Sequence, residues 1–175
     1  LNALLLSLAA FWLAAAVPVL AQETLPAATD MAAALPPDPA IRMGELPNGM
    51  RYWIRPNQTP PGKVYVWLRI NTGSLNEEDH QQGLAHFLEH MAFRDSENFP
   101  DSRLVSDIYA VGGEWHGYTW LDQTTYFATA PREQLDLLLR IEADRMARVT
   151  LSEADVVVER GAVINEADLM SVQVG

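Results

Sequence analysis

The sequence contains no cysteine among its 175 residues. This absence excludes disulfide bonds, cysteine-ligated zinc, iron–sulfur clusters and a thiol nucleophile. Basic residues are also scarce, because 12 Lys and Arg stand against 23 Asp and Glu, which gives a formal net charge of −11. Nucleic acids and anionic lipids are bound through basic patches, so this balance argues against nucleic acid as a partner.

Charge is missing altogether from residues 1–21, which are mostly Leu and Ala. This apolar run, with small residues at Val19-Leu20-Ala21, predicts a signal peptide cleaved before Gln22. The mature chain is then expected outside the cytoplasm, in a bacterial periplasm, and in contact with the membrane only through its export signal. Two alternatives are an uncleaved anchor, since about 18 apolar residues can barely span a bilayer, and a buried core helix.

The rest of the chain divides into a linker and one domain. Residues 22–42 are rich in proline and have no amphipathic pattern, which is typical of a mobile linker. A single domain without internal repeats is expected over residues 43–175. The sequence shows no completed element at its end, so we expect this domain to be truncated at the C-terminus.

Hydrophobic periodicity and turn residues predict alternating pairs of strands and helices in this domain. The expected strands are 50–55, 64–70, 114–120 and 124–130, and the expected helices are 81–93, 101–111, one opened by Pro131 and one starting at Ser152. The first two strands are expected to pair across the turn at 57–62. The order predicts an α+β fold, in which helices pack on one face of an antiparallel sheet.

Three details of the helices also follow from the sequence. Asp101 is the expected N-cap of the second helix, which Gly112-Gly113 should end. Ser152 and Asp155 resemble a capping box at the start of the last helix. In the third helix, one face is expected to carry Leu135, Leu138, Leu139, Glu142 and Met146.

The strongest chemical signal is His86-Phe87-Leu88-Glu89-His90. Residues four apart on a helix lie on the same face, so both imidazoles can bind one metal ion. Zinc suits imidazole and carboxylate ligands and keeps an open position for water, whose proton Glu89 could accept as a general base. The alternative is a pair of unrelated histidines on a helix surface.

Two carboxylates on the last helix, Glu159 and Glu166, lie seven residues apart and so project from one face. Carboxylates near a packing face are costly unless they are paired or bind a metal. By themselves, however, they fit a solvated helix edge equally well, with Arg160 as a local charge partner.

Taken together, these residues resemble the pitrilysin/insulinase family of zinc peptidases, the inverzincins, which carry H-x-x-E-H and a distal glutamate. Glu166 follows His90 by 76 positions, as in that family. The resemblance covers about residues 43–170. It is also carried by Leu46-Pro47-Asn48-Gly49-Met50, Gly83-Leu84-Ala85, Met91-Ala92-Phe93, Gly112-Gly113, Thr125-Tyr126, Glu142-Ala143-Asp144-Arg145-Met146 and Glu159-Arg160.

The resemblance implies a role for each of these residues. His86, His90 and Glu166 would bind Zn²⁺, and Glu89 would be the general base. Glu159 would not bind the metal but would orient a histidine ligand or the water. An extended substrate peptide would add to the edge of one strand. That substrate-binding strand comprises Glu114, Trp115, His116, Gly117, Tyr118 and Thr119.

One position on this strand departs from the family, which usually has Asn where this chain has His116. An Asn side chain offers a donor and an acceptor in a geometry that imidazole does not reproduce. Either His116 contacts substrate and adds pH sensitivity, or the position has drifted. Replacing His116 with Asn would slow peptide turnover in the first case and quicken it in the second.

The family also encloses its substrate between two halves, and the second half supplies an Arg/Tyr pair that this sequence lacks. The chain is therefore expected to need a missing C-terminal half or a partner subunit, and by itself to bind zinc at best weakly and to cleave little. The expected activity is that of a zinc endopeptidase acting on short or unfolded peptides. The alternatives are a non-catalytic structural homologue and a peptide-binding subunit.

Overall fold

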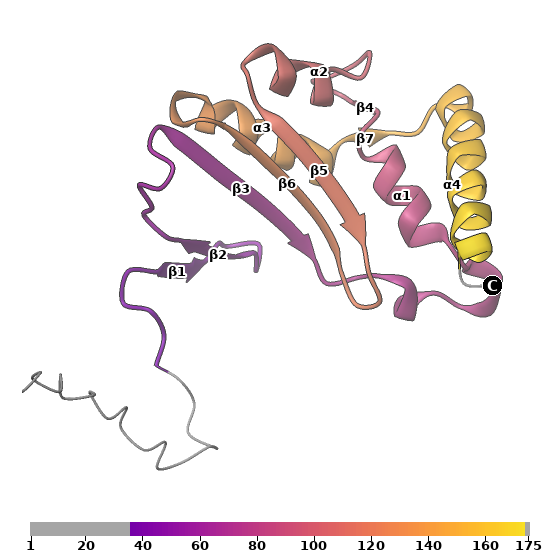
Figure 1. The fold of residues 1–175 in the computed structure, drawn as a ribbon, viewed down its shortest axis with the longest axis horizontal. Helices are drawn as coiled ribbons and strands as arrows, with labels where there is room; N and C mark the ends of the chain where they lie inside the picture. The colour runs from indigo at the N-terminus through magenta and orange to yellow at the C-terminus, as the bar shows by residue number, and fades with distance from the viewer. Residues whose placement is uncertain (1–35, 174–175) are drawn as a thin grey trace, which may run out of the picture. The chain divides into compact units, whose positions relative to one another are not determined.

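The computed structural model describes residues 36–173 of the chain, without the side chains of residues 168–173 (Figure 1). The predicted signal peptide at 1–21 and most of the predicted linker lie outside the described residues. Contacts divide the chain into two compact units, one that ends at Ile54 and one that begins at Arg55. Among the described residues, no helix is both long and apolar enough to cross a membrane.

The first unit contains an antiparallel hairpin of β1 (Arg42–Glu45) and β2 (Arg51–Ile54). A turn at Pro47-Asn48-Gly49 joins its strands, and Gly49 takes the positive φ of 84° that favours glycine there. The expected pairing of 50–55 with 64–70 is wrong, because β2 pairs with β1 and the second of these strands pairs elsewhere. Strand β1 includes residue 42, the expected end of the linker, and the first three residues of the expected domain.

The second unit is built on a three-stranded antiparallel sheet of order β3-β6-β5. These strands are β3 (Lys63–Ile70), β5 (Glu114–Thr119) and β6 (Thr124–Pro131). Trp67 lies opposite Phe127, and Trp115 lies opposite Ala128. Among the described strands β5 pairs only with β6, so its other edge is free to accept a further strand.

The helices of this unit are α1 (Leu84–Met91), α2 (Arg103–Ala110), α3 (Leu135–Ala147) and α4 (Glu153–Gln173). Short 3-10 turns η1 (Ser74–Asn76), η2 (Asp79–Gln81) and η3 (Arg132–Gln134), and a strand pair β4 (Asp95–Ser96) and β7 (Val149–Thr150), connect these elements. Helix α4 lies beside α1 (Figure 1).

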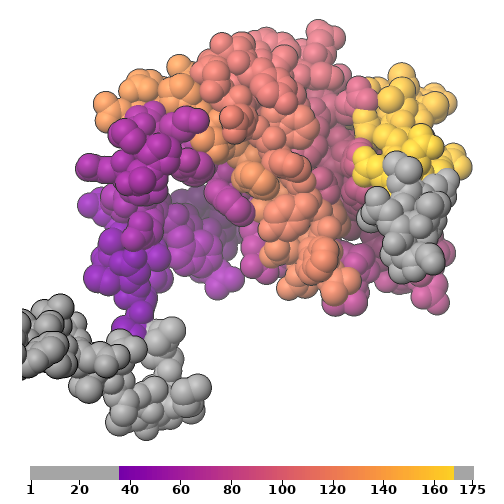
Figure 2. Space-filling model, in the orientation of Figure 1, coloured from indigo at the N-terminus to yellow at the C-terminus, as the bar shows by residue number. Residues whose placement is uncertain are grey.

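The core lies between one face of this sheet and helices α2 and α3. Leu104 and Ile108 of α2, and Leu138 and Ile141 of α3, are at most 1% exposed and pack with Ala128 of β6. Each such buried aliphatic side chain stabilises the fold by about 1.5–3 kcal/mol. This arrangement confirms the predicted α+β fold with helices on one face of an antiparallel sheet. Figure 2 looks onto the opposite face of β5 and β6, which no helix of this unit covers.

Helix α1, which carries the histidine motif, is shorter than the predicted 81–93. Gly83 precedes it with a φ of 87°. The carboxylate of Glu77 accepts hydrogen bonds from the backbone N–H groups of Gly83 at 2.9 Å and Ala85 at 2.7 Å. A negative charge on the free N–H groups of a first turn favours helix formation, so this loop fixes where the helix begins.

Two predictions about α2 and α3 are wrong in detail. Asp101 is not the N-cap of α2, because both Asp101 and Ser102 have positive φ and the helix begins at Arg103. Pro131 ends β6 instead of opening α3, whose first residue, Leu135, follows a 3-10 turn.

The buried face of α3 also differs from the one expected. It consists of Leu138, Ile141, Glu142, Asp144 and Arg145. Leu135, Leu139 and Met146 were expected to share the packing face but are 41–52% exposed. Leu138 and Glu142 of the expected face are buried as expected, and Glu142 forms a buried ion pair with Arg145, whose Nε lies 3.0 Å from a Glu142 oxygen. Arg145 is not on the expected face, because apolar periodicity does not predict burial of a charged residue.

The last helix confirms its predicted start. The Ser152 hydroxyl donates to the Asp155 carboxylate and accepts the Asp155 backbone N–H at 3.1 Å. This anchors the first turn of α4, from which Glu159 and Glu166 project toward α1.

Candidate active site

The two histidines of α1 and one carboxylate of α4 converge on one point. Nε2 of His86 and Nε2 of His90 are 3.1 Å apart. One Glu166 oxygen, Oε2, lies 3.3 Å from the first nitrogen and 3.6 Å from the second. The structure thus brings together all three residues predicted to bind the metal.

These separations fit a zinc ion. Tetrahedral ligands at Zn–N and Zn–O distances of about 2.0–2.1 Å lie about 3.3–3.4 Å from one another. The three measured separations, 3.1, 3.3 and 3.6 Å, are close to that value. Two imidazoles and one carboxylate form the donor set of a catalytic zinc site, which leaves the fourth position for water.

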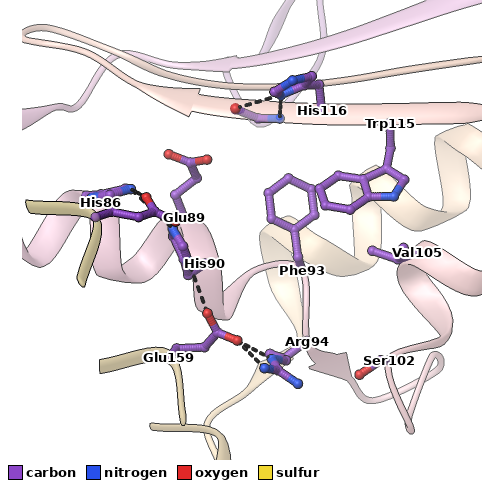
Figure 3. A pocket seen from close by; sticks show the side chains of 12 residues that line it. His86, Glu89, His90, Phe93, Arg94, Ser102, Val105, Trp115, His116 and Glu159 are labelled. Atoms are coloured by element: carbon purple, nitrogen blue, oxygen red, sulfur yellow. Dashed lines mark hydrogen bonds and ion pairs between the residues drawn. The ribbon is translucent and has the colours of Figure 1, made fainter. Parts of the chain in front are cut away.

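A carboxylate of α4 contacts Nδ1, the second ring nitrogen of His90. Nδ1 of His90 lies 2.8 Å from Oε2 of Glu159, while Arg94 forms an ion pair with the other Glu159 oxygen (Figure 3). With its proton on Nδ1, His90 presents the lone pair of Nε2 toward His86 and Glu166. Burial raises the pKa of Glu159, but hydrogen bonds from His90 and Arg94 and the positive charge of Arg94 lower it overall, below its ordinary value.

Glu89 lies between the predicted metal ligands and the sheet. It is 7% exposed, and its Oε2 accepts a hydrogen bond from the Thr119 hydroxyl at 2.6 Å. In Figure 3 its carboxylate projects toward the strand β5. A carboxylate held beside a metal site in this way can accept a proton from a water molecule and return it later.

A cleft of about 560 Å³ contains these groups. The predicted catalytic and metal-binding residues lie on one side of it. Phe93, Trp115, Val105, Ser102 and Arg94 extend the cleft beyond them. Figure 3 shows the ring of Phe93 next to that of Trp115, with ring centroids 4.3 Å apart. This part of the cleft has apolar walls large enough for a side chain of a bound peptide.

The six residues of the predicted substrate-binding strand alternate between two faces. Trp115, Gly117 and Thr119 are half-buried on the side of the helices, whereas Glu114, His116 and Tyr118 are exposed. His116 lies at the rim of the cleft, but its ring stacks on Phe127 at a centroid distance of 5.4 Å. Its Nδ1 is 3.1 Å from both the backbone N and the backbone O of Gly117.

Two contributors to the site are not among the residues predicted for the role they have. Arg94 pairs with Glu159, and a basic residue one turn after His90 is the sequence signal for such a partner. Thr119 was grouped with the substrate strand, and its contact with Glu89 depends on how β5 packs against α1, which no local pattern encodes.

A buried arginine supports the floor of the cleft. The guanidinium of Arg145 lies 4.6 Å from the ring centroid of Phe93 and 4.5 Å from that of Tyr126. One of its nitrogens, Nη1, donates to the backbone oxygen of Ala92 at 2.6 Å. These contacts tie the end of α1 to α3 and fix Phe93 against β5.

Comparison with known proteins agrees with this geometry. The profile of the family described as "Insulinase (Peptidase family M16)" matches residues 53–173. The chain belongs to this family of peptidases.

Among individual relatives, the probable zinc protease PqqL of Escherichia coli K12 is 35% identical over 143 residues, covering 78% of this chain and 15% of PqqL. The β subunit of the bovine mitochondrial-processing peptidase is 34% identical over 128 residues, covering 73% of this chain and 26% of that subunit. This chain therefore spans only a small part of the length of these relatives.

Solved structures give the same assignment. The first half of the periplasmic protease PqqL from Escherichia coli is 34% identical with a TM-score of 0.73, covering 78% of this chain and 31% of that one. Pitrilysin is 27% identical with a TM-score of 0.68, covering 74% of this chain and 14% of that one.

Proposed function

We propose that this chain carries the zinc-binding and proton-transfer groups of an endopeptidase or oligopeptidase that hydrolyses short or unfolded peptides. The observation that carries the proposal is the convergence of His86 Nε2, His90 Nε2 and Glu166 Oε2 at separations of 3.1–3.6 Å, with Glu89 beside them. Membership of a peptidase family, with relatives named as zinc proteases, supports it.

A zinc ion held by His86, His90 and Glu166 would act as a Lewis acid and make a water molecule acidic near neutral pH. Glu89 accepts the proton from the attacking water and delivers it to the leaving amide nitrogen. Glu159 keeps His90 in the tautomer that exposes Nε2. The peptide adds as a strand to the free edge of β5, where main-chain hydrogen bonds bind it with little regard to sequence.

We propose that a second half or a partner subunit completes the site. The chain covers only 14–31% of each relative named above. Groups that close this cleft and stabilise the oxyanion of the tetrahedral intermediate would come from that second part. The named periplasmic relative supports an exported, periplasmic location for the whole protein.

Turnover of an internally quenched peptide tests the proposal, in a polypeptide that supplies a second half. We expect activity that a chelator abolishes and added zinc restores. Glu89→Gln, which preserves size and all three metal ligands, should reduce kcat by at least 10²-fold while leaving zinc bound. Activity that persists in Glu89→Gln would refute the assignment of the base.

The second candidate is a non-catalytic homologue or a peptide-binding subunit. The outward-facing His116 ring, in place of the family's usual Asn, is the observation that favours it. In that case the quenched peptide would bind with micromolar affinity but remain intact, and Glu89→Gln would not alter its affinity.

If the chain does turn over peptide, His116→Asn tests the role of this residue, because only a substrate-contacting His116 gives slower turnover on replacement.

A further inference from the structure

The two carboxylate oxygens of Glu89 have different neighbours. Oε2 accepts the Thr119 hydroxyl at 2.6 Å, a short distance that is typical of a hydroxyl donating to an ionised carboxylate. Thr119 is at the end of β5 and Glu89 is in α1, thirty positions earlier. The bond therefore joins the edge of the sheet to the helix that carries the metal ligands.

The other oxygen, Oε1, lies next to Gly117, where the absence of a side chain leaves space beside the strand. A Cβ at Gly117 would be 3.0 Å from Oε1 of Glu89, and 2.7 and 2.8 Å from two ring carbons of Phe93. These distances are shorter than ordinary van der Waals contacts, so any larger residue at 117 would displace the carboxylate, the ring or the strand. Gly117 lies on the cleft side of β5, and both it and Glu89 line the cleft.

We propose that Thr119 is a positioning residue that occupies Oε2 of Glu89 and leaves Oε1, over Gly117, as the oxygen that accepts the proton from water. This inference rests on the proposed function. Three features restrict the Glu89 side chain: its place in α1, the hydroxyl on Oε2 and the position of Oε1 next to Gly117. A carboxylate that is 7% exposed and bonded on one oxygen has little freedom to rotate.

The proton balance is simple. One O–H bond of water breaks as the water oxygen forms a bond with the scissile carbonyl carbon, and the released proton forms an O–H bond with Oε1 of Glu89. As the scissile C–N bond breaks, the same proton passes to the leaving nitrogen and Oε1 is ionised again. Thr119 keeps its own proton throughout, because it donates a hydrogen bond and does not exchange a proton with substrate.

Thr119→Val tests the proposal, since valine keeps the shape of threonine and replaces the hydroxyl by a methyl group. Losing orientation without losing a metal ligand should reduce kcat by about 10- to 100-fold. KM should change by less than about threefold, because Thr119 does not bind the peptide through its hydroxyl. Thr119→Ser, which restores the donor, should recover most of the kcat.

The chain offers a matched control on the adjacent strand. Thr125 is 2% exposed and its hydroxyl has no hydrogen-bond partner, so Thr125→Val makes the same chemical change without removing a bond. We expect wild-type kcat from this variant. Equal losses in Thr119→Val and Thr125→Val would overturn the proposal, and so would wild-type kcat in Thr119→Val.

Two readouts do not depend on turnover. The zinc affinity of Thr119→Val should stay within about twofold of wild type, because Thr119 contacts none of the three ligands. In proton NMR, the Thr119 hydroxyl should give a slowly exchanging resonance that disappears in Glu89→Ala. If that resonance is absent, the inference fails by itself. If it is present while wild type and Glu89→Gln turn over peptide equally slowly, the proposed function fails and the catalytic role of Thr119 fails with it.

Discussion

Replacing Arg145 with Met should destabilise the chain strongly, because it breaks a buried ion pair. Arg145 is 5% exposed and Glu142 is 7% exposed, and the two are bonded at 3.0 Å. Methionine has a similar length and remains apolar between the rings of Phe93 and Tyr126. It leaves Glu142 as an unpaired buried carboxyl and the oxygen of Ala92 without its donor.

The magnitude follows from these losses. Removing one partner of a buried ion pair costs about 3–5 kcal/mol, because the remaining charge is neither solvated nor paired. Burial already raises the pKa of Glu142, and the loss of Arg145 removes the charge that opposes this rise. Glu142 can therefore take up a proton, which limits the cost to about 3–4 kcal/mol near neutral pH.

Urea unfolding followed by tryptophan fluorescence measures the effect. The control is Arg140→Met on the same helix, whose ion pair with Asp136 is exposed, with side chains 65% and 86% accessible. An exposed pair of this kind contributes less than about 0.5 kcal/mol. The double variant Arg145→Met/Glu142→Leu should be more stable than Arg145→Met alone. Equal unfolding midpoints for Arg145→Met and Arg140→Met would refute the reasoning.

Two further predictions concern α3 and α4. Burial raises the pKa of Asp144, but hydrogen bonds from its neighbours, including the backbone and side chain of Asn98, lower it overall. The stabilisation is therefore present above the unfolded pKa and lost as pH falls through the folded one, so Asp144→Asn should lower Tm at pH 6 by several degrees and by progressively less below pH 4. Glu159→Ala should weaken zinc binding by about 10- to 100-fold, because His90 loses the acceptor at Nδ1. Glu153→Ala, at the start of the same helix, is the control, and equal zinc affinities in the two variants would contradict the role of Glu159.

The sequence pattern predicts the part of the site whose residues follow the repeat of a single helix. His86, Glu89 and His90 were predicted on one helix, and their convergence with Glu166 was anticipated from the resemblance to inverzincins. The structure places them together. Their roles in zinc binding and catalysis stay predictions, as does the cleavage of residues 1–21.

The sequence pattern does not show which segments distant in the chain pair or pack with one another. The aromatic and β-branched run at 64–70 predicts a strand, but nothing local says that its partner is 124–131 and not 50–55. The predicted face of α3 is right for Leu138 and Glu142 but misses Arg145, a charged residue that is buried beside Glu142. The contact of Thr119 with Glu89 depends on side-chain rotamers across two packed elements, which a one-dimensional pattern does not contain.

Zinc binding by the chain itself tests the central claim most directly. The affinity would be measured by competition with a chromophoric chelator, for wild type, Glu166→Gln and the matched control Glu89→Gln. We predict one weak but saturable zinc site in wild type, the same affinity in Glu89→Gln and at least tenfold weaker binding in Glu166→Gln. A folded chain with no saturable site, or with equal affinity in wild type and Glu166→Gln, would contradict it.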